Sequence, residues 1–171
     1  MIKNLLPVFL LTIIFSCENS EQKLIKPTLF KILNAEESGI DFNNEIVEND
    51  SIHVLDNYYI YNGGGVGIGD FNNDGRSDVV FAGNMVNSKI YLNDGGLTFK
   101  DITNNTSIQT EDWMSGVNVV DLDGNGWDDI YFSSGVTCEF GCQNLLYMNQ
   151  GVDTNGIPEF KEQGKLVGLA D

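Results

Sequence analysis

Short runs of hydrophobic residues, separated by clusters of Asn, Asp and Gly, make up most of this chain after residue 62. The runs are rich in β-branched and aromatic residues, which favours strands joined by tight turns over helices. The predicted strands are 63–69, 78–83, 89–92, 97–102, 113–120, 129–134, 145–148 and 159–162. Alternating residues at 28–33 and 39–42 and a tyrosine-rich run at 52–62 extend this pattern toward the N-terminus. We therefore expect residues 28–62 to provide N-terminal strands that pack on the rest of the fold.

The later strands fall into two sets of four with the same order, and each set contains the same acidic loop. Asp70–Asp78 reads DFNNDGRSD, and 51 residues later Asp121–Asp129 reads DLDGNGWDD. A second motif, Tyr-Leu-Asn at 91–93, recurs as Tyr-Met-Asn at 147–149. A unit of four short strands that recurs at about fifty residues is typical of a β-propeller blade.

The predicted fold class is all-β, with two four-stranded β-propeller blades. We place repeat 1 at residues 59–110, repeat 2 at 113–164 and the start of a third repeat at 165–171. Two blades cannot close into a ring and would leave strand edges exposed. The chain is therefore expected to be part of a larger propeller, either as a fragment or as a truncated gene product.

The net charge of the chain excludes some classes of molecule as binding partners. Nine basic and 25 acidic residues give the 171-residue chain a net charge of −16. Such a chain is repelled by nucleic acids and by anionic membrane surfaces, so neither is an expected partner. Seven of the 25 acidic residues lie in the two repeated loops, which indicates cation binding there.

Each loop places oxygen-bearing side chains at its first, third, fifth and ninth positions and a Gly at its sixth. Ca²⁺ takes six to eight oxygen ligands at about 2.4 Å, and the Gly permits the reversal that turns these oxygens inward. The backbone carbonyl of the seventh position can complete the shell, so the side chain there is not expected to matter. The predicted ligands are Asp70, Asn72, Asp74, the Arg76 carbonyl and Asp78, and then Asp121, Asp123, Asn125, the Trp127 carbonyl and Asp129. The sequence thus predicts two Ca²⁺ ions, one in each loop.

Two other interpretations of the loops can be compared with this one. An EF-hand loop needs a carboxylate at its twelfth position, where this chain has Phe81 and Phe132. The residues that follow each loop are β-branched and aromatic, which favours a strand-to-strand connection over helical flanks. Clusters of Asp, Asn and Gly also form ordinary turns without a metal. That alternative stays open, although two aligned copies favour metal binding.

The N-terminus has the pattern of an export signal. Lys3 is followed by a mostly apolar run at 5–15, which is too short to span a membrane as a helix. The sequence IFSC at 14–17 resembles the bacterial lipobox, which implies cleavage before Cys17 and acylation of that residue. The alternative is ordinary secretion with an unmodified Cys17.

This pattern sets the expected organisation of the first residues and the expected localisation. We predict a lipoprotein-type signal peptide at 1–16, and a lipidated N-terminus with a polar tether at 17–27. The protein would be exported and would be an outer-membrane or cell-surface lipoprotein, attached to the membrane through its lipid anchor only. Cys138 and Cys142 lie in an insertion of the second repeat, and in an exported protein they favour a disulfide, with free thiols as the alternative.

The segment GGGVGIGDFNNDGRSDVVFAGN, together with the second acidic loop, resembles the FG-GAP and VCBS repeats of integrin-α-like β-propellers. It more closely resembles the N-terminal repeats of bacterial surface lipoproteins of the ASPIC/UnbV group. The resemblance covers roughly residues 28–171. It implies a propeller fold with Ca²⁺ bound between the first two strands of each blade, at the ten residues named above.

These features lead to one expected function and one alternative. The expected function is a Ca²⁺-stabilised β-propeller scaffold of an exported, membrane-anchored bacterial lipoprotein, which binds a protein or glycan at the cell surface. The alternative is a non-catalytic fragment of a larger surface enzyme, for example a glycan-degrading one, whose active site lies outside this chain. We expect no enzymatic activity from the chain, because its carboxylate pairs belong to the metal loops and a carboxylate that holds Ca²⁺ is a poor proton donor.

Overall fold

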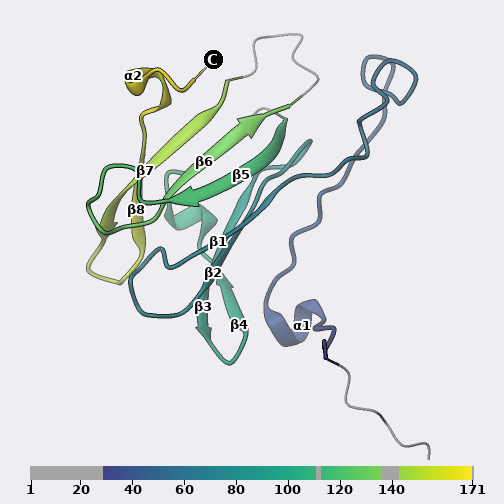
Figure 1. The fold of residues 1–171 in the computed structure, drawn as a ribbon. Helices are drawn as coiled ribbons and strands as arrows, with labels where there is room; N and C mark the ends of the chain where they lie inside the picture. Colours follow the sequence, from purple (N-terminus) through teal and green to yellow (C-terminus); the bar gives the residue numbers. More distant parts are fainter. Residues whose placement is uncertain (1–28, 111–112, 136–142, 171) are drawn as a thin grey trace, which may run out of the picture. The chain divides into compact units, whose positions relative to one another are not determined.

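A computed structural model of the chain describes residues 29–110, 113–135 and 143–170 (Figure 1). This described part is nearly all β, with two antiparallel four-stranded sheets. The predicted all-β class, with two units of four strands, is therefore confirmed. The sheets do not close into a barrel, as expected for separate blades. The signal peptide, Cys17, Cys138 and Cys142 lie outside the described residues.

Each sheet is a meander in which consecutive strands are neighbours. The strands of blade 1 are β1 (Val66–Gly69), β2 (Asp78–Phe81), β3 (Lys89–Gly95) and β4 (Thr98–Asp101). The strands of blade 2 are β5 (Met114–Val120), β6 (Asp129–Ser134), β7 (Leu145–Val152) and β8 (Pro158–Glu162). Both blades pair their strands in matching registers, for example Ile68 with Val79 in blade 1 and Val119 with Ile130 in blade 2.

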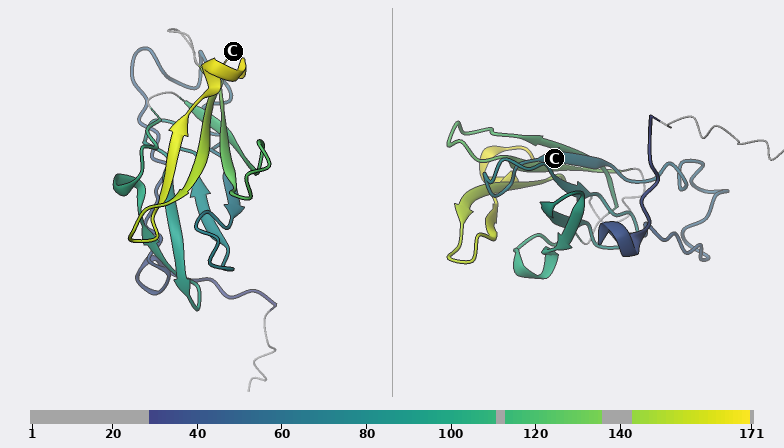
Figure 2. Two further views of the ribbon diagram at one scale, coloured as in Figure 1. Left: turned by 90° about the vertical axis from the view of Figure 1, so that its left-hand side faces the viewer. Right: turned by 90° about the horizontal axis from the view of Figure 1, so that it is seen from below.

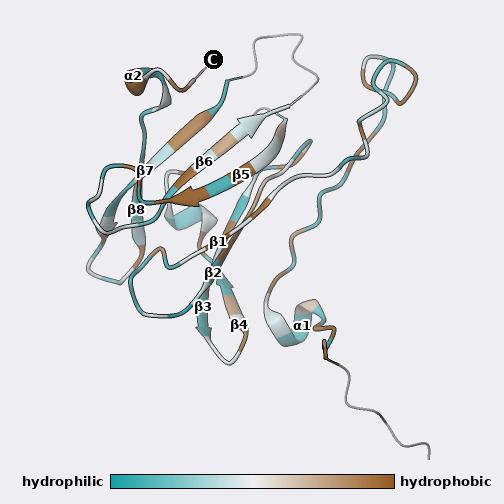
Figure 3. Ribbon diagram, in the orientation of Figure 1, coloured by the Kyte–Doolittle hydropathy of each residue, from teal (hydrophilic) through white to brown (hydrophobic). Residues whose placement is uncertain are grey.

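The core lies between the two sheets, which Figure 2 shows from two further directions. Figure 3 shows hydrophobic stretches along β5, β6 and β7, as expected for strands that bury one face. Both blades contribute buried side chains to a single cluster. Its members are Phe71, Val80, Ala82, Ile90, Leu92, Ile102, Ile108, Met114, Ile130, Phe132, Tyr147 and Phe160.

Two glycines of β1 allow the blades to approach closely. A Cβ atom added to Gly67 would lie 2.7 Å from Val119 Cγ2, and one added to Gly69 would lie 2.6 Å from Val119 Cγ1. Real Cβ atoms do not approach neighbours at such distances, so these positions leave no room for a side chain. These glycines of β1 thus let the strand pack closely against the Val119 side chain of blade 2, as is common for Gly within strands.

The segment before β1 differs from the prediction, because no strand forms within described residues 29–65. Instead Ala35–Ser38 forms one helical turn, α1, in which the Asn34 side chain accepts a hydrogen bond from Glu37 N, and Gly39 ends the turn with φ 76°. The alternation at 39–42 supports side-chain packing and not strand pairing. Phe42 stacks on Phe81 with 5.0 Å between ring centroids.

Three short helical segments complete the described part. Besides α1, these are the 3₁₀ turn η1 (Thr103–Asn105) and α2 (Gly164–Val167), so the expected start of a third repeat begins with a helical turn. None of the helices in the described residues has the length and hydrophobicity needed to cross a membrane.

Replacing Gly67 by Ala tests the close packing of the blades. We expect Gly67→Ala to lower the free energy of unfolding by about 1–3 kcal/mol, because the methyl group overpacks the core against Val119 and Val80. The measurement is the midpoint of urea denaturation. Val66→Ala in the same strand is the control, because Val66 is 59% exposed and should change stability by less than about 1 kcal/mol. Equal effects of the two substitutions would contradict the packing argument.

Candidate metal centre

Two acidic loops connect the first and second strands of their blades. Loop 1 (residues 70–78) leads from β1 into β2, and loop 2 (residues 121–129) leads from β5 into β6. Both loops are therefore strand-to-strand connections, which is the context that the sequence predicts. Their glycines at the sixth position, Gly75 and Gly126, have φ angles of 83° and 87°. Only Gly adopts this left-handed conformation without strain, so it forms the tight reversal in each loop.

The first Asp of each loop lies at the centre of the turn. Asp70 accepts hydrogen bonds from Asp74 N at 3.0 Å and from Gly75 N at 2.8 Å. Asp121 accepts them from Gly124 N at 2.8 Å and from Gly126 N at 2.9 Å. In this way both carboxylates point to the interior of the loop that a cation would occupy.

The ninth residue of each loop is a buried carboxylate. Asp78 is 0% exposed and Asp129 is 1% exposed. Asp78 accepts hydrogen bonds from Phe71 N at 2.9 Å and from Asn93 N at 2.8 Å. Asp129 accepts matching bonds from Leu122 N at 2.9 Å and Asn149 N at 2.8 Å. Each carboxylate thereby joins the loop, the second strand and the third strand of its blade.

Burial makes these carboxylates costly to ionise. It raises the pKa of Asp78 to about 6, although the two backbone N–H donors favour the ionised form. The nearby charges of Asp74 and Asp70 add to this rise. The pKa of Asp129 is also raised, first by burial and then by the charges of the neighbouring carboxylates. A cation beside these groups would offset the repulsion among them.

Loop 2 gathers its carboxylates as a metal site requires. Asp121, Asp123 and Asp129 each place one carboxylate oxygen within 4.8 Å of the others. Oxygens bound to one Ca²⁺ at 2.3–2.6 Å lie at most about 5 Å apart, so this cluster has the size of a Ca²⁺ shell. Within the described residues, no other three acidic, His or Cys side chains gather in this way. The donor set of loop 2 therefore fits Ca²⁺.

Loop 1 differs because its seventh residue contributes a side chain. Arg76 Nη2 lies 2.5 Å from Asp74 Oδ2, and Arg76 Nε donates a hydrogen bond to Asn93 O at 2.6 Å. Asn72 also donates to Asp74 Oδ2 at 3.0 Å. The sequence pattern did not predict these side-chain contacts, because it marks the seventh position only by its carbonyl. Whether the side chain there affects metal binding stays a prediction.

The two loops are joined across the blade interface. Asp70 N donates to Asp128 Oδ2 at 2.9 Å, and Asn73 Nδ2 donates to Gly126 O at 2.9 Å. Phe71 O accepts a third bond, from Asn149 Nδ2 at 2.9 Å. The loops are thus neighbours in space as well as repeats in sequence.

Asn93 and Asn149 are structural residues of the site, and the sequence pattern did not predict this role. In the sequence, their Tyr-x-Asn motif only marks the repeat. In the structure both side chains are buried, at 9% and 0% exposure, and each backbone N–H donates to the buried Asp of its own loop. The recurrence of Asn at the same place in both blades was the signal that could have identified them.

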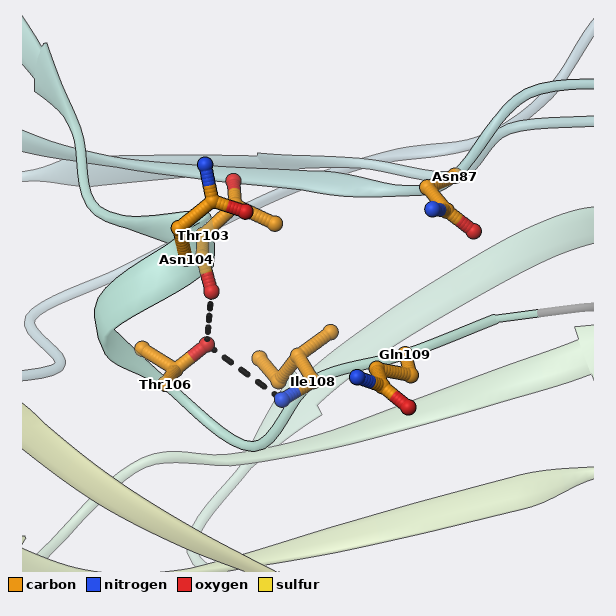
Figure 4. Close-up of a pocket in the computed structure, with 6 residues that line it drawn as sticks. All are labelled: Asn87, Thr103, Asn104, Thr106, Ile108 and Gln109. Atoms are coloured by element: carbon orange, nitrogen blue, oxygen red, sulfur yellow. Dashed lines mark hydrogen bonds between the residues drawn. The ribbon is translucent and has the colours of Figure 1, made fainter.

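A separate hollow lies at the other end of blade 1 (Figure 4). It has a volume of about 330 Å³ and lies where the β2–β3 connection meets the segment between β4 and β5. No charged side chain lines it. The lining residues are Asn87, Thr103, Asn104, Thr106, Ile108 and Gln109. The side-chain amides of Asn87, Asn104 and Gln109 make no hydrogen bond to other described residues, so they are available to a polar ligand.

Comparison with known protein families confirms the predicted resemblance to FG-GAP repeats. Residues 70–132 match the model of the FG-GAP-like repeat, a span that begins at Asp70 and includes both acidic loops. The chain thus carries an FG-GAP-like repeat, as its sequence pattern predicts. A comparison with curated proteins found no match. The finer resemblance to the ASPIC/UnbV group stays a prediction.

The bond between Asn149 and Phe71 can be tested with a matched pair of variants. Asn149→Ala removes side-chain bonds to Phe71 O, Asp128 O and Gly151 N, while Asn93→Ala removes only the two bonds within blade 1, to Ser77 O and Gly95 N. We expect both variants to be destabilised, and Asn149→Ala by about 0.5–1.5 kcal/mol more, because it alone loses a bond between blades. Urea denaturation measures the difference. Equal losses would show that the bond between blades contributes nothing.

Proposed function

We propose that this chain, which carries an FG-GAP-like repeat, is a Ca²⁺-stabilised binding scaffold made of β-propeller blades. The FG-GAP-like match and the two four-stranded sheets support the scaffold. The observation that carries the role of Ca²⁺ is the convergence of Asp121, Asp123 and Asp129 within 4.8 Å in loop 2. The buried position of Asp129 supports it further, because a buried carboxylate in an acidic cluster is stabilised by a cation.

Each loop would hold one Ca²⁺ through oxygen ligands. In loop 1 the ligands would be Asp70, Asn72, Asp74, the Arg76 carbonyl and Asp78, and in loop 2 Asp121, Asp123, Asn125, the Trp127 carbonyl and Asp129. Carboxylate, amide and carbonyl oxygens suit Ca²⁺, which accepts a flexible shell of six to eight oxygens. Mg²⁺ prefers a stricter octahedral shell and keeps more of its water, so it should bind these loops less well.

The role of the ions would be structural. Each ion would neutralise carboxylates that otherwise repel one another, and would thereby hold the connection between two strands in one conformation. Because the carboxylates would be engaged in this way, we propose no catalytic role for the chain. Binding would instead be the task of surfaces and hollows that the stabilised blades hold in place.

The expected partner is a protein or a glycan. The hollow lined by Asn104 and Gln109 supports this choice, because free amides bind neutral polar groups such as sugar hydroxyls or peptide groups. A net charge of −16 disfavours nucleic acid. The hollow lies away from the metal loops, at the opposite end of the strands, so a partner there would not compete with Ca²⁺.

We further propose that the protein is exported and anchored by a lipid at Cys17. The apolar run that follows Lys3 and the lipobox-like IFSC sequence support this. Extracellular Ca²⁺ modules typically have dissociation constants of about 10⁻⁴ to 10⁻³ M. Such weak sites would suit an exported protein that meets Ca²⁺ outside the cell.

Thermal unfolding with and without Ca²⁺ tests the proposed function. At about 10 mM Ca²⁺, sites with the affinities above should add roughly 1.4–2.7 kcal/mol each to the stability of the folded state, because the ion binds only that state. The melting temperature should therefore rise with Ca²⁺, fall again with EGTA and respond little to Mg²⁺.

A matched pair of variants makes this test specific to the loops. Asp121→Asn should remove most of the response that loop 2 contributes, while Asp153→Asn, in the β7–β8 turn, should leave it unchanged. A melting temperature that does not respond to Ca²⁺ would contradict the proposal and leave two ordinary acidic turns.

A further inference from the structure

We propose that the two metal loops are unequal, and that Arg76 makes loop 1 the weaker Ca²⁺ site and loop 2 the tighter one. This inference rests on the proposed function, because it concerns the affinity of the same two sites. The new element is a specific role for the Arg76 side chain, which is not itself a predicted ligand.

The types of the ligands do not distinguish the loops, but their placement does, because within the described residues only the carboxylates of loop 2 gather within 4.8 Å of one another. Each loop offers three Asp side chains and one Asn side chain at its first, third, fifth and ninth positions. Each also buries its ninth residue and ties it to two backbone N–H groups. Because the ligand types match, a difference in affinity must come from their placement and from the groups around them, and both favour loop 2.

Arg76 provides such a difference in loop 1. Its guanidinium is fixed at two points, because Nη2 pairs with Asp74 Oδ2 at 2.5 Å and Nε donates to Asn93 O at 2.6 Å. Asp74 is a predicted ligand, so Ca²⁺ must share this carboxylate with a positive charge. The guanidinium therefore competes with Ca²⁺ for this carboxylate.

Trp127 occupies the same position in loop 2 and brings no charge. Its ring packs beside the end of β7, where a Cβ atom at Gly151 would lie 3.5 Å from it. The carbonyl of Asn149, which corresponds to that of Asn93, accepts a bond from the neutral side chain of Asn125 at 3.1 Å. The same acceptor thus receives a guanidinium in blade 1 and an amide in blade 2.

The remaining charge in the region does not cancel this difference. Asp128 belongs to loop 2, but its Oδ2 accepts a hydrogen bond from Asp70 N at 2.9 Å. The carboxylate therefore lies at the boundary of the two loops and attracts a cation to both. Arg76 remains the one charged side chain that pairs with a predicted ligand within the described part of the loops.

The expected size of the effect follows from Coulomb's law. A unit positive charge about 6 Å from a divalent ion in a mostly aqueous setting weakens its binding roughly tenfold at low salt. Loop 2 should therefore fill first as Ca²⁺ rises, and loop 1 should fill at about tenfold higher concentration. Without the ion, the Arg76–Asp74 pair holds part of loop 1 in place.

Calorimetric titration of the full chain with Ca²⁺ tests the inference. Asp121→Asn leaves loop 1 as the intact site, and Asp70→Asn leaves loop 2, so the two variants isolate the loops with matched changes. We expect the Asp121→Asn protein to bind Ca²⁺ about tenfold more weakly than the Asp70→Asn protein, with a smaller gap at high salt. Circular dichroism checks that both variants are folded.

A second set of variants assigns the difference to Arg76. In the Asp121→Asn protein, Arg76→Gln should tighten Ca²⁺ binding about tenfold, while Arg76→Lys, which keeps the charge, should not. Lys100→Gln removes the same charge from β4 and is the control for net charge. Equal affinities of the two loops, or no gain from Arg76→Gln, would overturn the inference while leaving two Ca²⁺ sites. Absence of Ca²⁺ binding by the unaltered chain would overturn the proposed function as well.

Discussion

One buried carboxylate in each blade holds together the loop, the second strand and the third strand. Asp78 and Asp129 use both oxygens to accept backbone N–H groups, one from the loop and one from the Asn of the third strand. The bonds fix the loop on the sheet, but they also place a negative charge where burial opposes ionisation. The acidic cluster around each carboxylate follows from this arrangement, because a cation held there would relieve the cost that the fold itself creates.

The contact between the blades adds a second constraint on the same region. Val119 packs against β1, where Gly67 and Gly69 leave no room for a side chain. The corresponding positions of blade 2 are Asn118 and Val120. Blade 2 therefore lacks the two glycines that let β1 of blade 1 approach its neighbour closely. The blades are repeats in sequence, yet each is adapted to its place in the order.

The loops and the blade interface form a continuous region at one end of the strands. Asn73 and Asp128 link the loops directly, and Asn149 links the third strand of blade 2 to loop 1. Under the proposed function, an ion in loop 2 would therefore stabilise the surface against which loop 1 rests. The hollow near Gln109 lies at the other end, so ion binding and partner binding would be separate in space and joined only through the stability of the blades.

The sequence alone determined the features that depend on local chemistry. Alternating residues set the eight strands, and Gly75 and Gly126 set the turns, because strand periodicity and a left-handed φ are properties of neighbouring residues. The prediction of strands before residue 63 failed, because a strand also needs a partner edge and Phe42 instead stacks on Phe81. Only the tertiary structure decided that Arg76 pairs with Asp74 and that Asn149 reaches Phe71. These contacts depend on the conformation of a long side chain and on which strands are neighbours in space. The spacing of residues in the motif determines neither.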